Sequence, residues 1–194
     1  MKVYHWHNNL YVAGTSQSGI QTAHAQVGMI AEFHQRIDVQ EWMQDKTTIL
    51  FKGGNHSSLL EMSEFLSMGY CPWYAFSESK EALNGAMTNV CVLPGQRLED
   101  AAACYRKYGD SSFVQFDNRI FIPRIGDKYT CSHKLAIKKL NEDLRTYQRT
   151  ISDKNEVLQK QTARVMVELH RNNGEQFSPW ETELIKRIAS GRLM

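Results

Sequence analysis

The sequence predicts an α/β fold, in which helices pack on a small mixed β-sheet, followed by a mainly α-helical extension that contains one long helix. In the first half of the chain, short segments rich in β-branched and aromatic residues alternate with amphipathic helical segments. Residues 132 to 172 contain neither proline nor glycine and are typical of one continuous helix. A chain of 194 residues with 42% hydrophobic content suffices for one core and an accessory element.

The first half of the chain is expected to form an α/β domain, which we assign to residues 1 to 97. Its elements follow in the order strand, helix, strand, helix, strand, strand, which indicates a sheet covered by helices. The second helix follows Asn55 or Ser57 as its cap and carries Leu59, Met62, Phe65 and Leu66 on one face. The expected strands cover residues 2–7, 47–52, 71–78 and 86–95.

Residues 98 to 194 form the predicted extension. Its long helix has apolar residues at alternating spacings of three and four, so it needs a partner surface. We therefore expect a homodimer or packing against the last helix, and the same helix could take a protein partner. Ser178 and Glu181 predict a capping box before that last helix. The expected elements are a helix at 98–109, a β-hairpin at 113–123, the long helix at 132–172 and the C-terminal helix at 178–190.

Charge is divided unevenly between the two parts. Residues 1 to 97 hold six basic and eight acidic residues, a net charge of −2, whereas the remainder holds seventeen and thirteen, a net charge of +4. A basic face on the long helix would attract tRNA or another nucleic acid, although an ordinary solvated helix face gives the same counts. The RNA-binding candidates on this helix are Lys134, Lys138, Lys139, Arg145 and Arg149.

Several classes of protein are disfavoured by the sequence. It contains neither a membrane-spanning apolar stretch nor a signal peptide, which predicts a cytoplasmic protein without a membrane partner. His5 and His7 have the alternate spacing of many metal sites, but no carboxylate follows at a recognisable offset, so we expect neither a metal nor another cofactor. The cysteines form no C-x-x-C pair and are expected to be free thiols: Cys71, Cys91, Cys104 and Cys131.

The stretch SQSGIQTAHA, residues 16 to 25, begins the first helix with small polar residues and sets Gln21 and His24 three positions apart. Here the chain resembles the type 2 peptidyl-tRNA hydrolases, whose first helix has the pattern G-K-x-A-x-Q-x-x-H-A. Gln21 and His24 match that pattern, and Thr88 corresponds to the threonine of the family's closing strand. The resemblance covers about half of the chain and follows the family's order of elements.

The resemblance implies a peptidyl-tRNA hydrolase type 2-like α/β domain that cleaves the ester between a peptide and its tRNA. It implies catalytic roles for Gln21, His24 and Thr88. A histidine at the start of an apolar helix is also often a packed residue, so a structural or substrate-orienting role for His24 remains an alternative. The substrate-binding residues implied at the start of the helix are Gln17, Ser18 and Gly19.

The sequence departs from the family pattern at two positions. Gln17 replaces the lysine beside the first helix, and the aspartate before the last strand is replaced within residues 77 to 84. Only Glu78, Lys80 and Glu81 could serve there, and Glu78 and Lys80 are the catalytic candidates. Two functions therefore follow as expectations. The first is an enzyme that hydrolyses the ester on tRNA. The second is a catalytically inactive binding protein that keeps this fold and uses the long helix for assembly with tRNA, a nucleotide or a protein.

Overall fold

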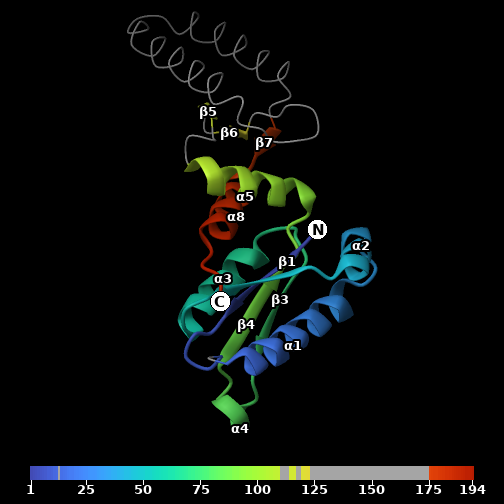
Figure 1. Ribbon diagram of the computed structural model, residues 1–194, viewed down its shortest axis with the longest axis vertical. Helices are drawn as coiled ribbons and strands as arrows, with labels where there is room; N and C mark the ends of the chain where they lie inside the picture. Colours follow the sequence, from blue (N-terminus) through green and yellow to red (C-terminus); the bar gives the residue numbers. More distant parts are fainter. Residues whose placement is uncertain (13, 110–113, 117–118, 123–174) are drawn as a thin grey trace, which may run out of the picture. The chain divides into compact units, whose positions relative to one another are not determined.

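The computed structural model describes residues 1–12, 14–109, 114–116, 119–122 and 175–194 (Figure 1). Contacts divide the chain into two compact units, Met1–Glu99 with Ser190–Met194 and Asp100–Ala189. The first unit is an α/β structure built on a four-stranded mixed sheet, as the sequence predicts. None of the described helices has the length and hydropathy needed to cross a bilayer.

The sheet of the first unit has the strand order β2-β1-β4-β3. β1 pairs with β2 in parallel, whereas β4 runs antiparallel to both β1 and β3. The carboxyl ends of β1, β2 and β3 therefore meet the amino end of β4 at one edge, which we call the carboxyl edge. Ligands of open α/β sheets commonly bind at such an edge. The strands are β1 (Val3–His7), β2 (Thr48–Lys52), β3 (Trp73–Ser77) and β4 (Met87–Val92).

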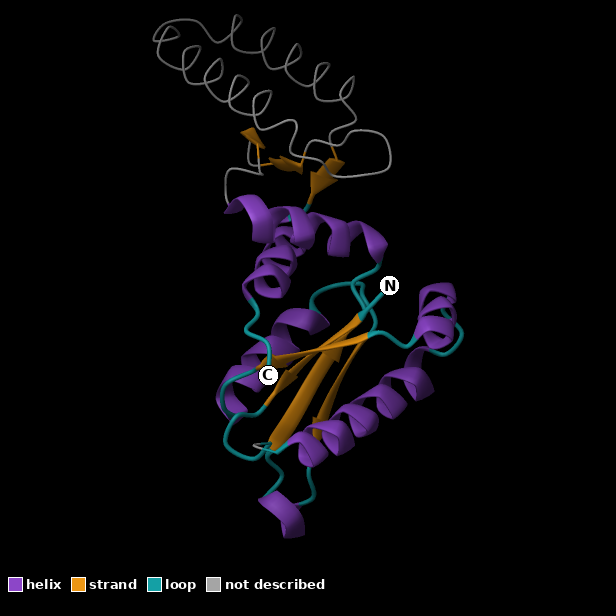
Figure 2. Ribbon diagram, viewed as in Figure 1, coloured by secondary structure: helices purple, strands orange, loops and turns teal. Residues whose placement is uncertain are grey.

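Helices α1 (Thr15–Phe33) and α3 (His56–Ser67) lie along different sides of this sheet (Figure 2). Under α1 lies a core cluster that also includes residues of α2 (Ile37–Asp45). Phe51 packs on the other sheet face, where its ring centroid lies 5.8 Å from that of Tyr4 and 5.5 Å from that of Trp6. The cluster under α1 contains Val3, Ala25, Met29, Val39, Trp42, Cys91 and Leu93.

Local sequence signals explain how the helices begin. The Asn55 side chain accepts a hydrogen bond from the Ser58 N–H at 3.0 Å, which decides the cap of α3 in favour of Asn55. The four apolar residues predicted to share one face of α3 are all buried. Neither α2 nor the single-turn helix α4 (Lys80–Leu83), which follows Ser79 as its cap, is among the elements that the sequence predicts.

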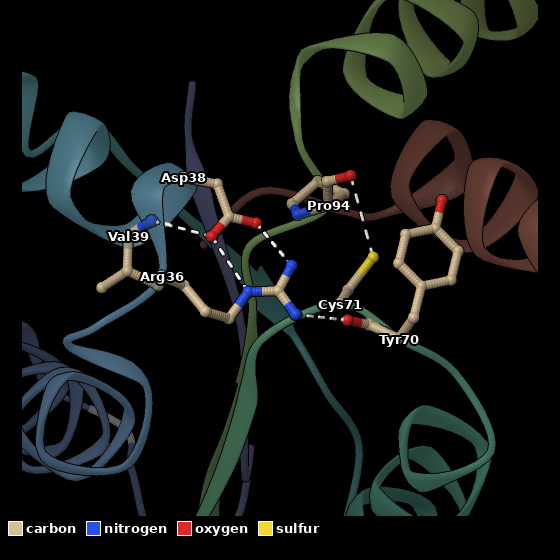
Figure 3. A network of polar contacts seen from close by, with 6 residues as sticks. All are labelled: Arg36, Asp38, Val39, Tyr70, Cys71 and Pro94. Atoms are coloured by element: carbon tan, nitrogen blue, oxygen red, sulfur yellow. Dashed lines mark hydrogen bonds and ion pairs between the residues drawn. The ribbon is translucent and has the colours of Figure 1, made fainter.

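A polar contact network fixes the turn between α1 and α2 (Figure 3). The Arg36 guanidinium forms an ion pair with Asp38 at 2.7 Å and donates to the Tyr70 carbonyl at 2.8 Å. The thiol of Cys71 donates to the Pro94 carbonyl at 3.7 Å, and burial raises its pKa to about 12. Arg36 thereby joins the turn to the segment that leads into β3. Among the described residues, Cys71, Cys91 and Cys104 are free thiols, and Cys131 lies outside them.

The second unit combines the greater part of α5 (Gln96–Tyr108) with a three-stranded antiparallel sheet and α8 (Pro179–Ser190). Ser178 and Glu181 form the predicted capping box, with N–H to oxygen distances of 2.7 and 3.1 Å. The Arg106 guanidinium donates to the carbonyl of Ile188 at 2.9 Å and to that of Ala189 at 3.1 Å. The strands are β5 (Val114–Phe116), β6 (Arg119–Ile122) and β7 (Glu175–Phe177).

The predicted long helix at 132–172 and its five RNA-binding candidates lie outside the described residues. After α8 the chain returns to the first unit. Phe51 and Leu193 form an antiparallel bridge, the Lys52 N–H donates to the Arg192 carbonyl at 2.9 Å, and the Met194 N–H donates to the Leu50 carbonyl at 3.1 Å. Residues 192 to 194 therefore add a short segment of backbone to the outer edge of β2.

Candidate functional site

Three of the predicted catalytic residues meet at the carboxyl edge. The Thr88 hydroxyl donates to Gln21 Oε1 at 2.6 Å, and Gln21 Nε2 donates to Glu78 Oε1 at 2.6 Å. Each partner fixes one end of the Gln21 amide, so the orientation of that amide is set by its contacts. The result is a directed chain of hydrogen bonds from the strand β4, through the helix α1, to the carboxylate that follows β3.

An irregularity in the sheet places Thr88 in this chain. β3 and β4 pair regularly up to Phe76 and Asn89, but Ser77 then pairs with Met87. Thr88 is therefore the extra residue of a β-bulge, a feature that redirects side chains and is frequent beside functional sites. Both Thr88 and its neighbour Asn89 direct their side chains toward groups on the α1 side of the sheet.

Glu78 combines a fixed backbone with an available carboxylate oxygen. Its backbone N–H donates to the Ala86 carbonyl at 3.0 Å, and its side chain is half-buried. Gln21 is 9% exposed and Thr88 is fully buried, so the carboxylate is held from the buried side of the site. Among the described residues only Gln21 donates to this carboxylate, through Oε1. Oε2 can therefore accept a proton or a hydrogen bond from a water or a ligand.

The other two catalytic candidates lie apart from this chain. His24 is exposed, and its ring stacks on that of Phe76 with a centroid distance of 4.6 Å and an interplanar angle of 9°. It makes no hydrogen bond to another described side chain. Lys80 is exposed on α4 and forms no ion pair with a described residue. The geometry thus gives Glu78, and not Lys80, the contact with Gln21.

The predicted substrate-binding residues occupy the first turn of α1. Gln17 and Gly19 are exposed, whereas Ser18 is buried and its hydroxyl donates to the Gly14 carbonyl at 3.0 Å. Gly14 precedes the helix without a side-chain cap, and the first turn contains no acidic residue. Unpaired backbone N–H groups at such a terminus can stabilise a negative charge.

Sequence reasoning missed a second polar network beneath α1. The His5 ring donates from Nδ1 to Asn89 Oδ1 at 3.0 Å, while its Nε2 lies 3.3 Å from the Gln26 amide nitrogen. His7 Nε2 lies 3.1 Å from the Thr22 hydroxyl. Burial lowers the pKa of His5 to about 3 and that of His7 to about 4, so both rings are neutral near pH 7. The alternate spacing of these two histidines in β1 is the sequence feature that could have indicated this network.

His56 also lies at the carboxyl edge and was not among the predicted site residues. Its Nδ1 accepts the Met87 N–H at 3.0 Å, which leaves the proton of the neutral ring on Nε2. Met87 directly precedes Thr88 in the chain. Within the described part of the chain, no group of three or more His, Cys, Asp or Glu residues is arranged to hold a metal ion.

No model of a protein family matches this chain, and no curated protein matches it. The support for a function is thus the geometry of the carboxyl edge together with the resemblance of residues 16 to 25.

Proposed function

We propose that the carboxyl edge hydrolyses the ester that links a peptide or another acyl group to tRNA. The observation that carries this proposal is the hydrogen-bond chain from Thr88 through Gln21 to Glu78, with both distances at 2.6 Å. It holds a carboxylate with an available oxygen close to the first helix, whose amino-terminal turn has no side-chain cap. The resemblance of this helix to that of the type 2 peptidyl-tRNA hydrolases supplies the substrate class.

The proposed reaction uses Glu78 as general base. Its free carboxylate oxygen takes a proton from a water, and the water oxygen attacks the ester carbonyl. Backbone N–H groups at the start of α1 stabilise the oxyanion that develops. The ester bond to the ribose oxygen then breaks, and this oxygen takes the proton from Glu78. The products are a free carboxylic acid and a tRNA with a free terminal hydroxyl.

Gln21 and Thr88 act as positioning residues in this scheme. Gln21 donates to Glu78 Oε1 and leaves Oε2 available, while Thr88 fixes the amide of Gln21. We expect Glu78→Gln to lower the rate of hydrolysis by at least about 100-fold, the usual contribution of a general base. Gln21→Ala is expected to lower it as well, because Glu78 then loses its orientation. The measurement is release of the acyl group from N-acetylated aminoacyl-tRNA.

Glu81→Gln is the matched control for Glu78→Gln. Glu81 lies three residues further along, is exposed on α4, and makes no contact with Gln21. Its replacement should leave the rate unchanged. Equal rates for the wild type, Glu78→Gln and Glu81→Gln would show that Glu78 is not the base.

One observation favours a second candidate function, that of a binding protein without catalysis. Gln17 is exposed at the first turn of α1, where the resembled family has a lysine, so this turn lacks that cation. The same assay separates the two functions. Wild-type protein that binds tRNA but releases no more acyl group than buffer would be a binding protein.

A further inference from the structure

Two cations lie opposite each other where residues 192 to 194 pair with β2. Because Phe51 and Leu193 form the antiparallel bridge, Lys52 is the cross-strand neighbour of Arg192. The Lys52 N–H donates to the Arg192 carbonyl at 2.9 Å, which fixes the two backbones side by side. Neighbouring residues across two strands direct their side chains to the same face. We call Lys52 and Arg192 the cation pair.

Nothing among the described residues neutralises the cation pair. Both side chains are exposed, and neither forms a hydrogen bond or an ion pair with a described residue. Like charges directly opposite each other in a sheet destabilise it. An anion placed between the two would remove this repulsion and accept hydrogen bonds from both. Arginine and lysine together suit a phosphate group, which offers several acceptor oxygens.

The cation pair lies at the same edge of the sheet as Glu78, Gln21 and Thr88. Lys52 is the register partner of His7, the last residue of β1, and His7 contacts Thr22 of α1. The side chain of Lys52 is therefore on the α1 side of the sheet. β2 is two strand spacings, about 10 Å, from β4, which carries Thr88, and three spacings, about 14 Å, from β3, which Glu78 follows. A nucleotide chain could extend from the reacting ester to the cation pair.

We infer that Lys52 and Arg192 bind a backbone phosphate of the tRNA end that carries the ester. The identity of the polynucleotide rests on the proposed function, whereas the preference for an anion rests on the two unpaired cations. The sequence gives no indication of this subsite, because its two residues are 140 positions apart. The cation pair would also supply positive charge at the carboxyl edge, a charge that the neutral side chain of Gln17 does not provide.

The test measures binding of a 5′-fluorescein-labelled single-stranded RNA ending in CCA to the full-length protein by fluorescence anisotropy, over a range of salt concentrations. Lys52→Met and Arg192→Met should each weaken binding about tenfold, the effect of losing one charge-assisted contact. Each should also lower the slope of log affinity against log salt by about 0.7. Arg192→Lys keeps the positive charge, so it should retain most of the wild-type slope.

Lys2→Met is the matched control. Lys2 is an exposed lysine that precedes β1, at the opposite end of the same sheet. Its replacement should change neither affinity nor slope. Unchanged RNA binding in both Lys52→Met and Arg192→Met would overturn the inference. Binding of inorganic phosphate that depends on the cation pair, with RNA affinity equal in all variants, would overturn it too, because the pair would then hold a free anion only.

The outcomes also separate this inference from the proposed function. If the wild type hydrolyses N-acetylated aminoacyl-tRNA and the two variants bind RNA normally, the hydrolase stands and the subsite is wrong. If the wild type shows no hydrolysis but the variants lose affinity and salt dependence, the phosphate subsite stands and the hydrolase is wrong.

Discussion

Two buried histidines illustrate how much a single residue depends on its surroundings. His5 and His7 are fully buried beneath α1, and within the described part of the chain the hydrogen bonds of their rings are to neutral side chains. A neutral imidazole satisfies such partners with one donor and one acceptor, whereas an imidazolium would place an uncompensated charge in the core. The network therefore stabilises the fold only while both rings are neutral.

Acid should destabilise the protein in a defined pH range. Burial lowers the pKa of His7 to about 4 and that of His5 to about 3, below the value of 6.5 expected in the unfolded chain. As the pH falls below 6.5 the unfolded chain takes up protons that the folded chain does not, so stability decreases until each folded pKa is reached. For His7 alone the loss is roughly 3 kcal/mol. Urea denaturation at several pH values measures it.

His7→Gln should flatten this pH dependence between pH 6.5 and 4, whatever its effect on stability at pH 7. His34→Gln serves as control, because His34 is exposed and its ring lies against the nearby Ala31 carbonyl on the surface. If both variants keep the wild-type slope of unfolding free energy against pH, the acid sensitivity comes from other groups.

The candidate site was accessible to sequence reasoning only in part. The resemblance to a family pattern indicates Gln21 and Thr88, and the structure brings them together. The choice between Glu78 and Lys80 could not be made, because spacing within a loop does not determine which side chain turns toward the helix. Lys52 and Arg192 could not be paired either, since a bridge of a few residues leaves no periodic signal.

At the level of elements, a strong apolar pattern is sufficient to predict a strand or a helix, and a weak pattern is not. The strands of the first sheet and the helix α3 follow from their patterns. In α2 only Val39 and Trp42 are buried, which is too few to establish a helical period. The residue that ends α2 in the left-handed conformation is Lys46, with φ of 57°, so the usual glycine stop signal is missing.

The packing of α1 on β3 depends on a glycine. A Cβ added at Gly28 would lie 2.3 Å from the Tyr74 ring, whereas one at Gly19 would meet no atom within 4 Å. Alanine normally stabilises a helix interior relative to glycine by about 1 kcal/mol. We expect Gly19→Ala to stabilise the protein by up to that amount. Gly28→Ala should destabilise it by about 1–3 kcal/mol, because the helix or the ring must move.

Thermal or urea unfolding of both variants tests this expectation, and the two substitutions lie in the same helix. Equal stabilisation by Gly28→Ala and Gly19→Ala would mean that Tyr74 moves aside at little cost, and that the close approach does not fix the position of α1.

On the scale of the whole molecule, the first unit is discontinuous in sequence. The chain leaves it within α5 and returns for Ser190–Met194. The sequence predicts a boundary at residue 97 with the last residues in the extension, since nothing in their pattern indicates pairing with β2. Gly191 lies so close to β2 that an added Cβ would be 2.7 Å from the Phe51 ring. The returning segment, Ser190–Met194, is thus closely packed against β2 at Gly191.

A shortened protein tests whether these last residues complete the sheet. We expect residues 1–99 joined to residues 190–194 by a flexible Gly-Ser linker to fold, because Leu98, only 1% exposed, and the partner strand of β2 are both kept. Deleting residues 192–194 from this linked protein removes two backbone hydrogen bonds and exposes the edge of β2. That should lower the free energy of unfolding by about 1–3 kcal/mol and promote aggregation. Urea denaturation and light scattering measure both effects, and identical unfolding midpoints with and without residues 192–194 would show that β2 is stable as an open edge.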